Sequence, residues 1–318
     1  MYSLPGRHDI DPTAILAPFY FLFFGLMLSD AAYGLILTTL CAIILKKYKP
    51  EGTTHRMIKM FMFCGLSTFM WGALFGGWFG NFFTVAAKTF FGKEFVIKPL
   101  WFDPLSEPMK LLVVSLILGA IHLFVGMGVQ AYMDIKDGRP LDALFDIGLW
   151  YLLLIGIVLF AFGGKLGAGA VGIGKIMAII GAVGILLTGG RKKKGIFGKL
   201  TGGLGSLYGI TSYLSDVLSY SRLLALGLAT GVVAQVFNTL GSLAGGGIAG
   251  SVLLIVVFAF GTVFNIAINA LGAFVHSCRL QYVEFFGKFY TGGGRPFAPF
   301  ERKTKYIKIL KEGNDNVK

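Results

Sequence analysis

The sequence is poor in charged residues, and poorest in acidic ones. Asp and Glu together number 16 against 29 Lys and Arg, and all charged residues make up 14% of the 318-residue chain. Soluble domains carry about 25% charged residues. Hydrophobic residues make up 55%, and the mean hydropathy is +0.73. This composition excludes an ordinary soluble domain and predicts a polytopic membrane protein in a lipid bilayer.

Motifs for several kinds of chemistry are also missing. The three cysteines, Cys41, Cys64 and Cys278, lie inside apolar segments, so we expect neither a disulfide framework nor a metal site. No Gly-x-x-x-x-Gly-Lys-Ser/Thr motif occurs, so nucleotide chemistry is not expected on this chain. The net charge of +13 gathers in loops and in the tail. We interpret it as a signal for membrane orientation and expect no catalytic residue, cofactor or nucleic-acid partner.

Long apolar runs predict an all-α, polytopic helical membrane bundle. A crossing needs about 20 residues, and the last two runs are much longer, so we expect them to be strongly tilted. A further apolar stretch, 17–46, is interrupted around Asp30, and its 30 or so residues are too few for two full crossings. We favour a hairpin of two short helices over one tilted helix there, which gives about eight helical segments. The six other runs are 57–81, 109–133, 144–163, 168–188, 205–243 and 248–290.

Basic clusters predict the orientation of the bundle. Clusters at 46–59, 191–194 and 302–305 all fall in the cytoplasm if 57–290 forms six crossings. The C-terminus is then cytoplasmic. The outer loops are 82–108, 164–167 and 244–247. We divide the chain into a short N-terminal segment (1–16), N-terminal membrane helices (17–134), middle helices with a basic cytoplasmic loop (135–204), two long helices (205–290) and a basic tail (291–318).

Two arginines lie in the two long segments. Arg222 is about 25 Å along the axis from the start of its segment. A charge at that depth costs roughly 3 kcal/mol on insertion scales and usually marks a functional site. Arg279 lies near the end of the last segment, where it either acts in the same site or extends its side chain to the interface. Asp30 is a partner for a buried arginine or, as we prefer, the cap of a helix.

Polar side chains accompany both arginines. Spacings of four, four and three place the first group on the Arg222 face of one helix, and similar spacings place the second group on one face of the next helix. We expect the first stripe to be the wall of a blind aqueous cleft that ends at Arg222, and the two stripes to be offset, one opening to each side of the membrane. Alternatively, such hydroxyls bond their own helix backbone, and a lone histidine is simply buried. The candidates are Thr211, Ser215, Ser219 and, near the mouth, Asp216; then Thr262, Asn265, Asn269, His276 and Glu284.

Several stretches resemble a known family. SYSRLLALGLA at 219–229 and HSCRLQYVEFFGKFY at 276–290 are similar to the stator membrane subunit of rotary vacuolar/archaeal-type ATPases, called subunit a or subunit I. PFYFLFFGLMLSDAAYG at 18–34 and FAPF at 297–300 resemble the same family. The resemblance implies that Arg222 and Arg279 are the two family arginines. It also implies an ion path against a rotating proteolipid ring whose carboxylates carry H⁺ or Na⁺.

The resemblance also implies partners and leaves alternatives open. Family members contact peripheral stalk and central rotor subunits through a cytoplasmic half that would precede residue 17, and we expect a prokaryotic plasma membrane. Asn269 and Thr230 stand where some relatives have a titratable group, so H⁺ and Na⁺ both remain open. A stand-alone transporter or channel that binds an anion at Arg222 and Arg279 is the alternative. A scaffold whose arginines pair with Asp30 or Glu284 is the third hypothesis.

Overall fold

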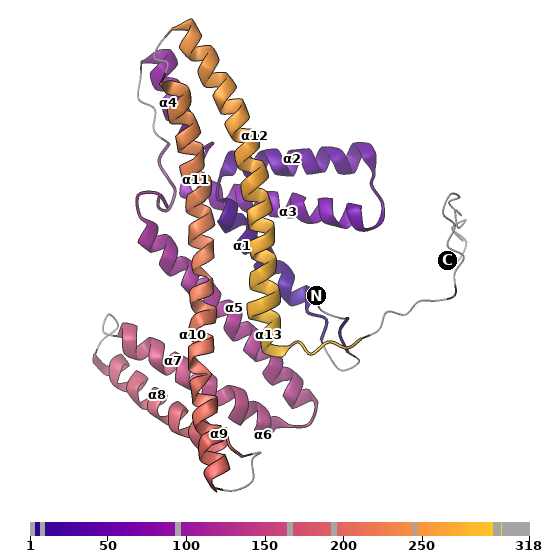
Figure 1. Cartoon of the computed structure of the whole chain (residues 1–318), viewed down its shortest axis with the longest axis vertical. Helices are drawn as coiled ribbons and strands as arrows, with labels where there is room; N and C mark the ends of the chain where they lie inside the picture. Colours follow the sequence, from indigo (N-terminus) through magenta and orange to yellow (C-terminus); the bar gives the residue numbers. More distant parts are fainter. Residues whose placement is uncertain are drawn as a thin grey trace. The chain divides into compact units, whose positions relative to one another are not determined.

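The computed structural model describes residues 4–6, 10–92, 97–163, 168–191, 196–243, 247–294 and 300 (Figure 1). The predicted outer loop 164–167, residues 244–246 of the predicted loop 244–247, and the basic residues 192–194 and 302–305 lie outside the described residues. The chain divides into two units. Met1–Ile10 and Tyr290–Lys318 form the smaller one, in which Leu4 and Gly294 make an isolated antiparallel bridge. Asp11–Phe289 forms the larger unit, which holds all the described helices.

The stretch predicted as a hairpin consists of two helices. Helix α1 spans Thr13–Leu28 and α2 spans Ala31–Tyr48. Ser29 ends α1 in the left-handed region at φ 36°, and the Asp30 side chain caps α2. The predicted break and the cap are therefore confirmed, and a single tilted helix is excluded. Both helices pack mainly against α3, Gly52–Phe75, rather than against each other.

The directions of these helices follow from close contacts at glycines. A Cβ on Gly72 of α3 would lie 2.0 Å from Ala31 N, and one on Gly34 of α2 would lie 2.3 Å from Phe69 N. Residue numbers therefore rise along α3 as they fall along α2, so these two helices are antiparallel. Glycine is needed at both positions because backbone, rather than a movable side chain, would meet a Cβ.

The middle of the chain adds three longer helices and short connecting ones. Helix α5, Pro108–Lys136, leads through α6, Pro140–Ala143, and the π-helical turn Leu144–Gly148 into α7, Leu149–Phe162. Helix α8, Ala168–Thr188, packs closely along α7. The predicted outer loop 82–108 was only partly right, because it contains helix α4, Phe82–Phe91. That helix forms where the Phe82 ring can stack on Phe258, with ring centroids 3.7 Å apart.

The two long segments are confirmed, with an earlier start for the first. Helices α9 (Ile196–Tyr208), α10 (Ile210–Ser219) and α11 (Ser221–Ser242) follow one another with only short turns between them. Helix α12, Ile248–Arg279, continues through the π-helix Leu280–Phe285 into α13, Phe286–Phe289. Helices α2 and α3 cross the direction of α11 and α12 (Figure 1). Helices that cross in this way cannot all lie along one bilayer normal, which supports the predicted tilt of the last two.

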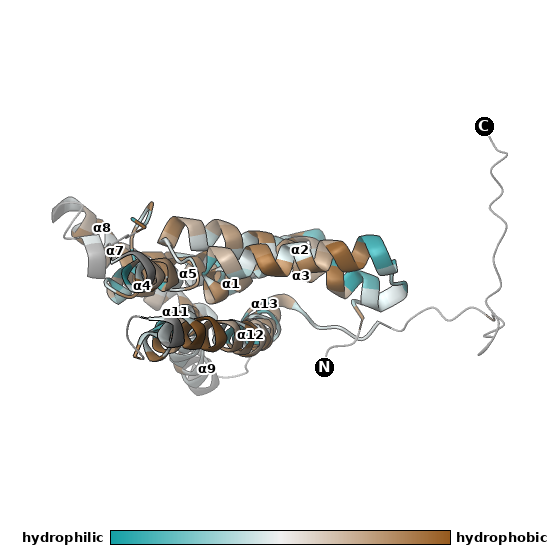
Figure 2. Ribbon diagram, turned by 90° about the horizontal axis from the view of Figure 1, so that it is seen from above, coloured by the Kyte–Doolittle hydropathy of each residue, from teal (hydrophilic) through white to brown (hydrophobic). Residues whose placement is uncertain are grey.

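The larger unit is a helical membrane bundle. Within the described residues, seven stretches are long and apolar enough to cross a membrane, and α1 is an eighth, shorter apolar helix, as predicted. Figure 2 shows α11 and α12 in one layer and α1, α2, α3 and α5 in another. Helix α1 lies at the core: Phe23, Phe24, Leu26 and Met27 are fully buried against residues of α5, α11 and the last helix.

Candidate functional site

Arg222 lies at the start of α11 and pairs with a buried acid. Backbone bonds from Tyr220 N to Val217 O and from Leu223 N to Tyr220 O tighten the chain just before and after Arg222. Its Nη1 donates to Glu284 Oε1 at 3.2 Å. The Glu284 side chain is 3% exposed, whereas that of Arg222 is 26% exposed. Arg222 therefore compensates a charge that would be costly to bury alone, while part of its guanidinium stays open.

A second ion pair lies about 1.7 helical turns before Arg222 along the same path. Lys288 Nζ donates to Asp216 Oδ2, and the same ammonium lies 4.1 Å from the centroid of the Tyr213 ring. Asp216 precedes Arg222 by six residues, about 9 Å along a helix, and Lys288 follows Glu284 by four. The two pairs, Arg222–Glu284 and Asp216–Lys288, are here called the ion-pair ladder. They join α10 and α11 to the π-helix and α13 that follow α12.

A buried histidine completes this region. His122 of α5 is fully buried, and its Nδ1 lies 2.7 Å from the Tyr220 hydroxyl. Its ring stacks on Phe285, with centroids 4.2 Å apart. Gln281 is 1% exposed, and neither of its side-chain amide atoms has a hydrogen-bond partner among the described residues. The sequence analysis missed His122, Tyr220, Gln281 and Lys288; a lone histidine in an apolar run was the one visible signal.

The polar stripe on α12 faces inward. Asn265 is fully buried, and its Nδ2 donates to the Tyr33 hydroxyl at 3.0 Å and to Thr230 O at 3.1 Å. Asn269, 7% exposed, donates in turn to Asn265. Thr262 is half-buried. These contacts join α12 to α2 and α11, so the stripe is a continuous polar seam between helices.

Near the C-terminal end of α12 the stripe differs from its part at Asn265 and Asn269. His276 is half-buried, and its Nδ1 has no hydrogen-bond partner among the described residues. Arg279 is exposed in the isolated chain. The structure therefore does not bring Arg279 into the Arg222–Glu284 pair.

The stripe that precedes Arg222 is more open. Thr211 and Ser215 are exposed and Ser219 is half-buried. The Thr211 hydroxyl donates to Tyr208 O at 2.8 Å, which is the backbone bond that membrane helices often show. Ser215 and Ser219 share the exposed side of α10 with it.

Asp30 is a structural cap rather than the partner of an arginine. Its carboxylate accepts from the backbone N–H groups of Ala32 and Tyr33 at the start of α2, and from those of Phe79 and Gly80 at 3.2 and 2.9 Å. The second pair, missed in the sequence, ties the α1–α2 turn to the segment after α3. No cluster of three His, Cys, Asp or Glu side chains that would hold a metal occurs in the described part of the chain.

The sequence was compared with known proteins. The V-type ATPase 116 kDa subunit family matches residues 210–302, which include both arginines. A-type ATP synthase subunit I of Methanocaldococcus jannaschii is 35% identical over 96% of this chain and 47% of its own length. The same subunit of Pyrococcus horikoshii is 38% identical over 97% and 46%. V-type ATP synthase subunit I of Borreliella burgdorferi is 25% identical over 95% and 51%.

The chain is similar to this family over residues 210–302, and to the subunit I relatives over nearly its whole length. The resemblance noted at 219–229 and 276–290 is confirmed, and both stretches fall inside the matched region. The chain spans about half the length of the curated relatives it matches. It is a membrane protein.

Proposed function

We propose that this chain is the stator membrane subunit of a rotary A/V-type ATP synthase or ATPase. In this role it guides ions through two half-channels against a rotating proteolipid ring, and Arg222 displaces the ion from a ring carboxylate. The observation that carries the proposal is the position of Arg222. The Asp216–Lys288 pair precedes it on α10, and the polar seam at Asn265, which bonds Thr230 O of α11, follows it.

The chemistry of a guanidinium suits this role. It stays protonated in a protein, and an opposite charge within about 4–6 Å favours the ionised, empty form of a carboxylate. An arriving ring carboxylate would therefore release its ion beside Arg222. Glu284 binds only Nη1 in the described structure, so the remaining guanidinium donors are available to a second carboxylate.

One face of α11 and α12 is suited to a helical, apolar partner. In Figure 2 the other side of this layer is covered by α1, α3 and α5. Large apolar side chains are exposed at a spacing of four along α11, and at spacings of four, seven, eight and four along α12. Such stripes pack well against other membrane helices. They comprise Val232, Val236 and Leu240 on α11, and Val252, Val256, Val263, Leu271 and Val275 on α12.

We assign one half-channel to each of the two polar stripes. On the proposed cytoplasmic side, Thr211, Ser215, Ser219 and Asp216 lead towards Arg222, and Glu284 marks the end of that path. On the outer side, the path follows Thr262, Asn265, Asn269 and His276, with Arg279 beyond. The transported ion is H⁺ or Na⁺, and peripheral stalk and central rotor subunits complete the complex. A prokaryotic plasma membrane with a cytoplasmic C-terminus fits the basic clusters.

ATP-driven ion uptake by vesicles that carry the assembled complex tests this proposal. Arg222→Ala is compared with the unmodified chain, in buffer with and without Na⁺. We expect normal assembly and a loss of uptake with Arg222→Ala, and the Na⁺ dependence of the unmodified complex identifies the ion. Near-normal uptake by an assembled Arg222→Ala complex would remove Arg222 from the mechanism. Purification without a proteolipid ring would instead favour a stand-alone transporter.

A further inference from the structure

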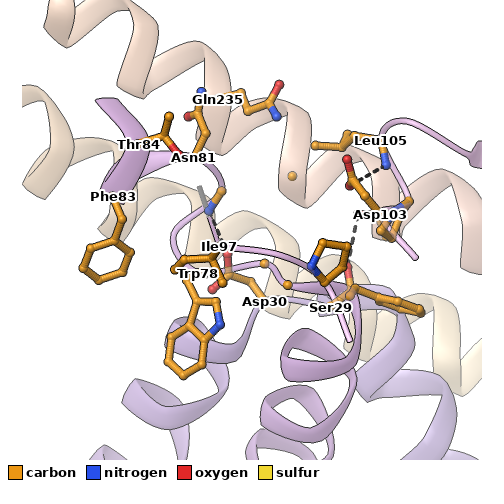
Figure 3. A pocket seen from close by; sticks show the side chains of 18 residues that line it. Ser29, Asp30, Trp78, Asn81, Phe83, Thr84, Ile97, Asp103, Leu105 and Gln235 are labelled. Carbon is orange, nitrogen blue, oxygen red and sulfur yellow. Dashed lines mark hydrogen bonds between the residues drawn. The ribbon is translucent and has the colours of Figure 1, made fainter. Parts of the chain in front are cut away.

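A cavity of about 220 Å³ lies beside the middle of α11, where Gly227, Gly231 and Gln235 line it (Figure 3). Five segments line it: the α1–α2 turn, the end of α3 with the segment 76–81 after it, the start of α4, the loop 97–105 before α5, and the inner face of α11. The volume is large enough for several water molecules. Its polar lining side chains are Ser29, Asp30, Asn81, Thr84, Asp103 and Gln235.

We propose that this cavity is the external mouth of the outer half-channel and that it concentrates cations from the outer medium. The inference rests on the proposed function, because that function supplies the half-channel. Three features of the cavity support the proposal: its charge, its position relative to Arg222, and its link to the polar seam.

The charge of the cavity is one-sided. Two carboxylates line it, and no Lys, Arg or His is among its described lining residues. Asp30 is buried and its oxygens accept four backbone N–H bonds, so it is a fixed part of the wall. Asp103 is half-buried, and its Oδ1 accepts from Leu105 N at 3.0 Å. A cleft with charge of one sign and low-dielectric walls raises the local concentration of counter-ions.

The cavity lies on the far side of Arg222 from the Asp216–Lys288 pair. Gly227 and Gln235 line it, and they follow Arg222 by 5 and 13 residues, or about 8 and 20 Å along α11. Asp216 precedes Arg222 by about 9 Å. Two half-channels that meet at one arginine require polar regions on opposite sides of it, and these two regions meet that requirement.

The cavity also connects to the seam on α12. Ser29 Oγ donates to Gly227 O at 3.2 Å in the wall of the cavity. Asp30 accepts from the backbone N–H of Tyr33, and the Tyr33 hydroxyl accepts from Asn265. Asn269 bonds Asn265 in turn. Tyr33 therefore bonds the cavity wall through its backbone and the stripe that we assign to the outer half-channel through its hydroxyl, so one residue links the two.

The test uses thiol labelling of the assembled complex in sealed vesicles of both orientations. In a background without Cys41, Cys64 and Cys278, Gln235→Cys places a thiol in the cavity. Val236→Cys is the matched control, because Val236 is the next residue along α11 and is 51% exposed on the apolar face. Two membrane-impermeant methanethiosulfonate reagents are compared: one with a trimethylammonium group and one with a sulfonate group.

We expect Gln235→Cys to react from the external side only, and Val236→Cys to react from neither. The cationic reagent should react about ten times faster than the anionic one, because the carboxylates attract it. Asp103→Asn should remove most of that preference, because it removes a negative charge. It should leave the loop in place, because the amide Oδ1 can still accept from Leu105 N. Reaction from the cytoplasmic side, no reaction, or a charge preference that Asp103→Asn leaves unchanged would each overturn the proposal.

The same vesicles separate this inference from the proposed function. Loss of uptake in Arg222→Ala with no labelling of Gln235→Cys would retain the stator role and reject the mouth. External labelling with the expected charge preference, but full uptake in Arg222→Ala, would reject the stator role and leave the cavity as an external, cation-attracting hollow without a half-channel.

Discussion

Nη1 of Arg222 lies 3.2 Å from Oε1 of Glu284, yet the two side chains are buried to very different degrees, with 26% and 3% exposed. The acid is held inside the bundle and the arginine reaches it from the edge. Glu284 thus fixes the position of Arg222 from the partner helix, which makes it a positioning residue for the charge that the proposed mechanism depends on.

Replacing Glu284 with Gln should loosen that position. Truncating a fully buried ion pair costs about 3–5 kcal/mol, but a partly exposed Arg222 can be solvated and Gln keeps one acceptor oxygen. We therefore expect a loss of about 1–2 kcal/mol in the free energy of unfolding of the purified chain in mild detergent. The assembled complex should retain some uptake, unlike Arg222→Ala.

The control for this variant is Glu107→Gln. Glu107 pairs with Lys110 at 2.7 Å, but both side chains are well exposed. Such a pair contributes about 0–1 kcal/mol, so unfolding should hardly change. Equal losses in the free energy of unfolding for the two variants would mean that burial of Glu284 does not determine how much its ion pair stabilises the fold.

The Asp216–Lys288 pair can be tested by exchanging its charges. Asp216 and Lys288 are 22% and 13% exposed. Asp216→Lys or Lys288→Asp alone places like charges in contact, so each should lower stability by about 1–3 kcal/mol. The double exchange restores an opposite pair but places a carboxylate beside the Tyr213 ring, so we expect only partial recovery. Thermal unfolding of all four proteins measures this coupling, and strictly additive losses would show that the two side chains do not interact.

Local signals in the sequence predicted a good part of this structure. The break at Ser29–Asp30 followed from an acid and a nearby glycine inside an apolar run, and the structure adds the cap bonds that such an acid makes. The lengths of the last two helices followed from hydropathy alone. These features depend on neighbours within a few residues, which is why the sequence carries them.

The contacts between distant segments could not be predicted in the same way. Arg222 meets Glu284 across 62 positions, and that meeting depends on the register of two helices. The π-helix Leu280–Phe285 adds to the difficulty, because it changes which side chains of the last helix turn inward. Helix α4 escaped notice because its 10 residues are too few to cross a membrane, so hydropathy assigns them to a loop.

Asp30 offers a test of the cap. In the structure Oδ1 of Asp30 accepts from the N–H groups of Ala32, Tyr33 and Phe79, and Oδ2 accepts from Gly80 N. Asp30→Asn keeps one acceptor oxygen but turns an amide NH₂ towards the donors of the other, which leaves at least one buried N–H without a partner. An unsatisfied buried donor costs about 1–3 kcal/mol, so we expect at least that loss in thermal unfolding. Asp103→Asn serves as the control, because its Oδ1 accepts only from Leu105 N and the amide can replace it. A smaller loss for Asp30→Asn than for Asp103→Asn would contradict the role of Asp30 as the joint between the α1–α2 turn and residues 79–80.

The close approach of α2 and α3 predicts that Gly72→Ala is strongly destabilising. The new Cβ would lie 2.0 Å from Ala31 N and 2.4 Å from Asp30 C. Because these are backbone atoms, no side chain can move to relieve the contact, and we expect a loss near the upper end of overpacking effects, about 3 kcal/mol. Gly172→Ala on α8 is the matched control, since no atom lies within 4 Å of its Cβ position. Alanine is about 0.5–1 kcal/mol better than glycine inside a helix, so this control should be neutral or slightly stabilising. Thermal unfolding in the same detergent compares the two, and a similar result for both would mean that α2 and α3 are not packed backbone to backbone at Gly72.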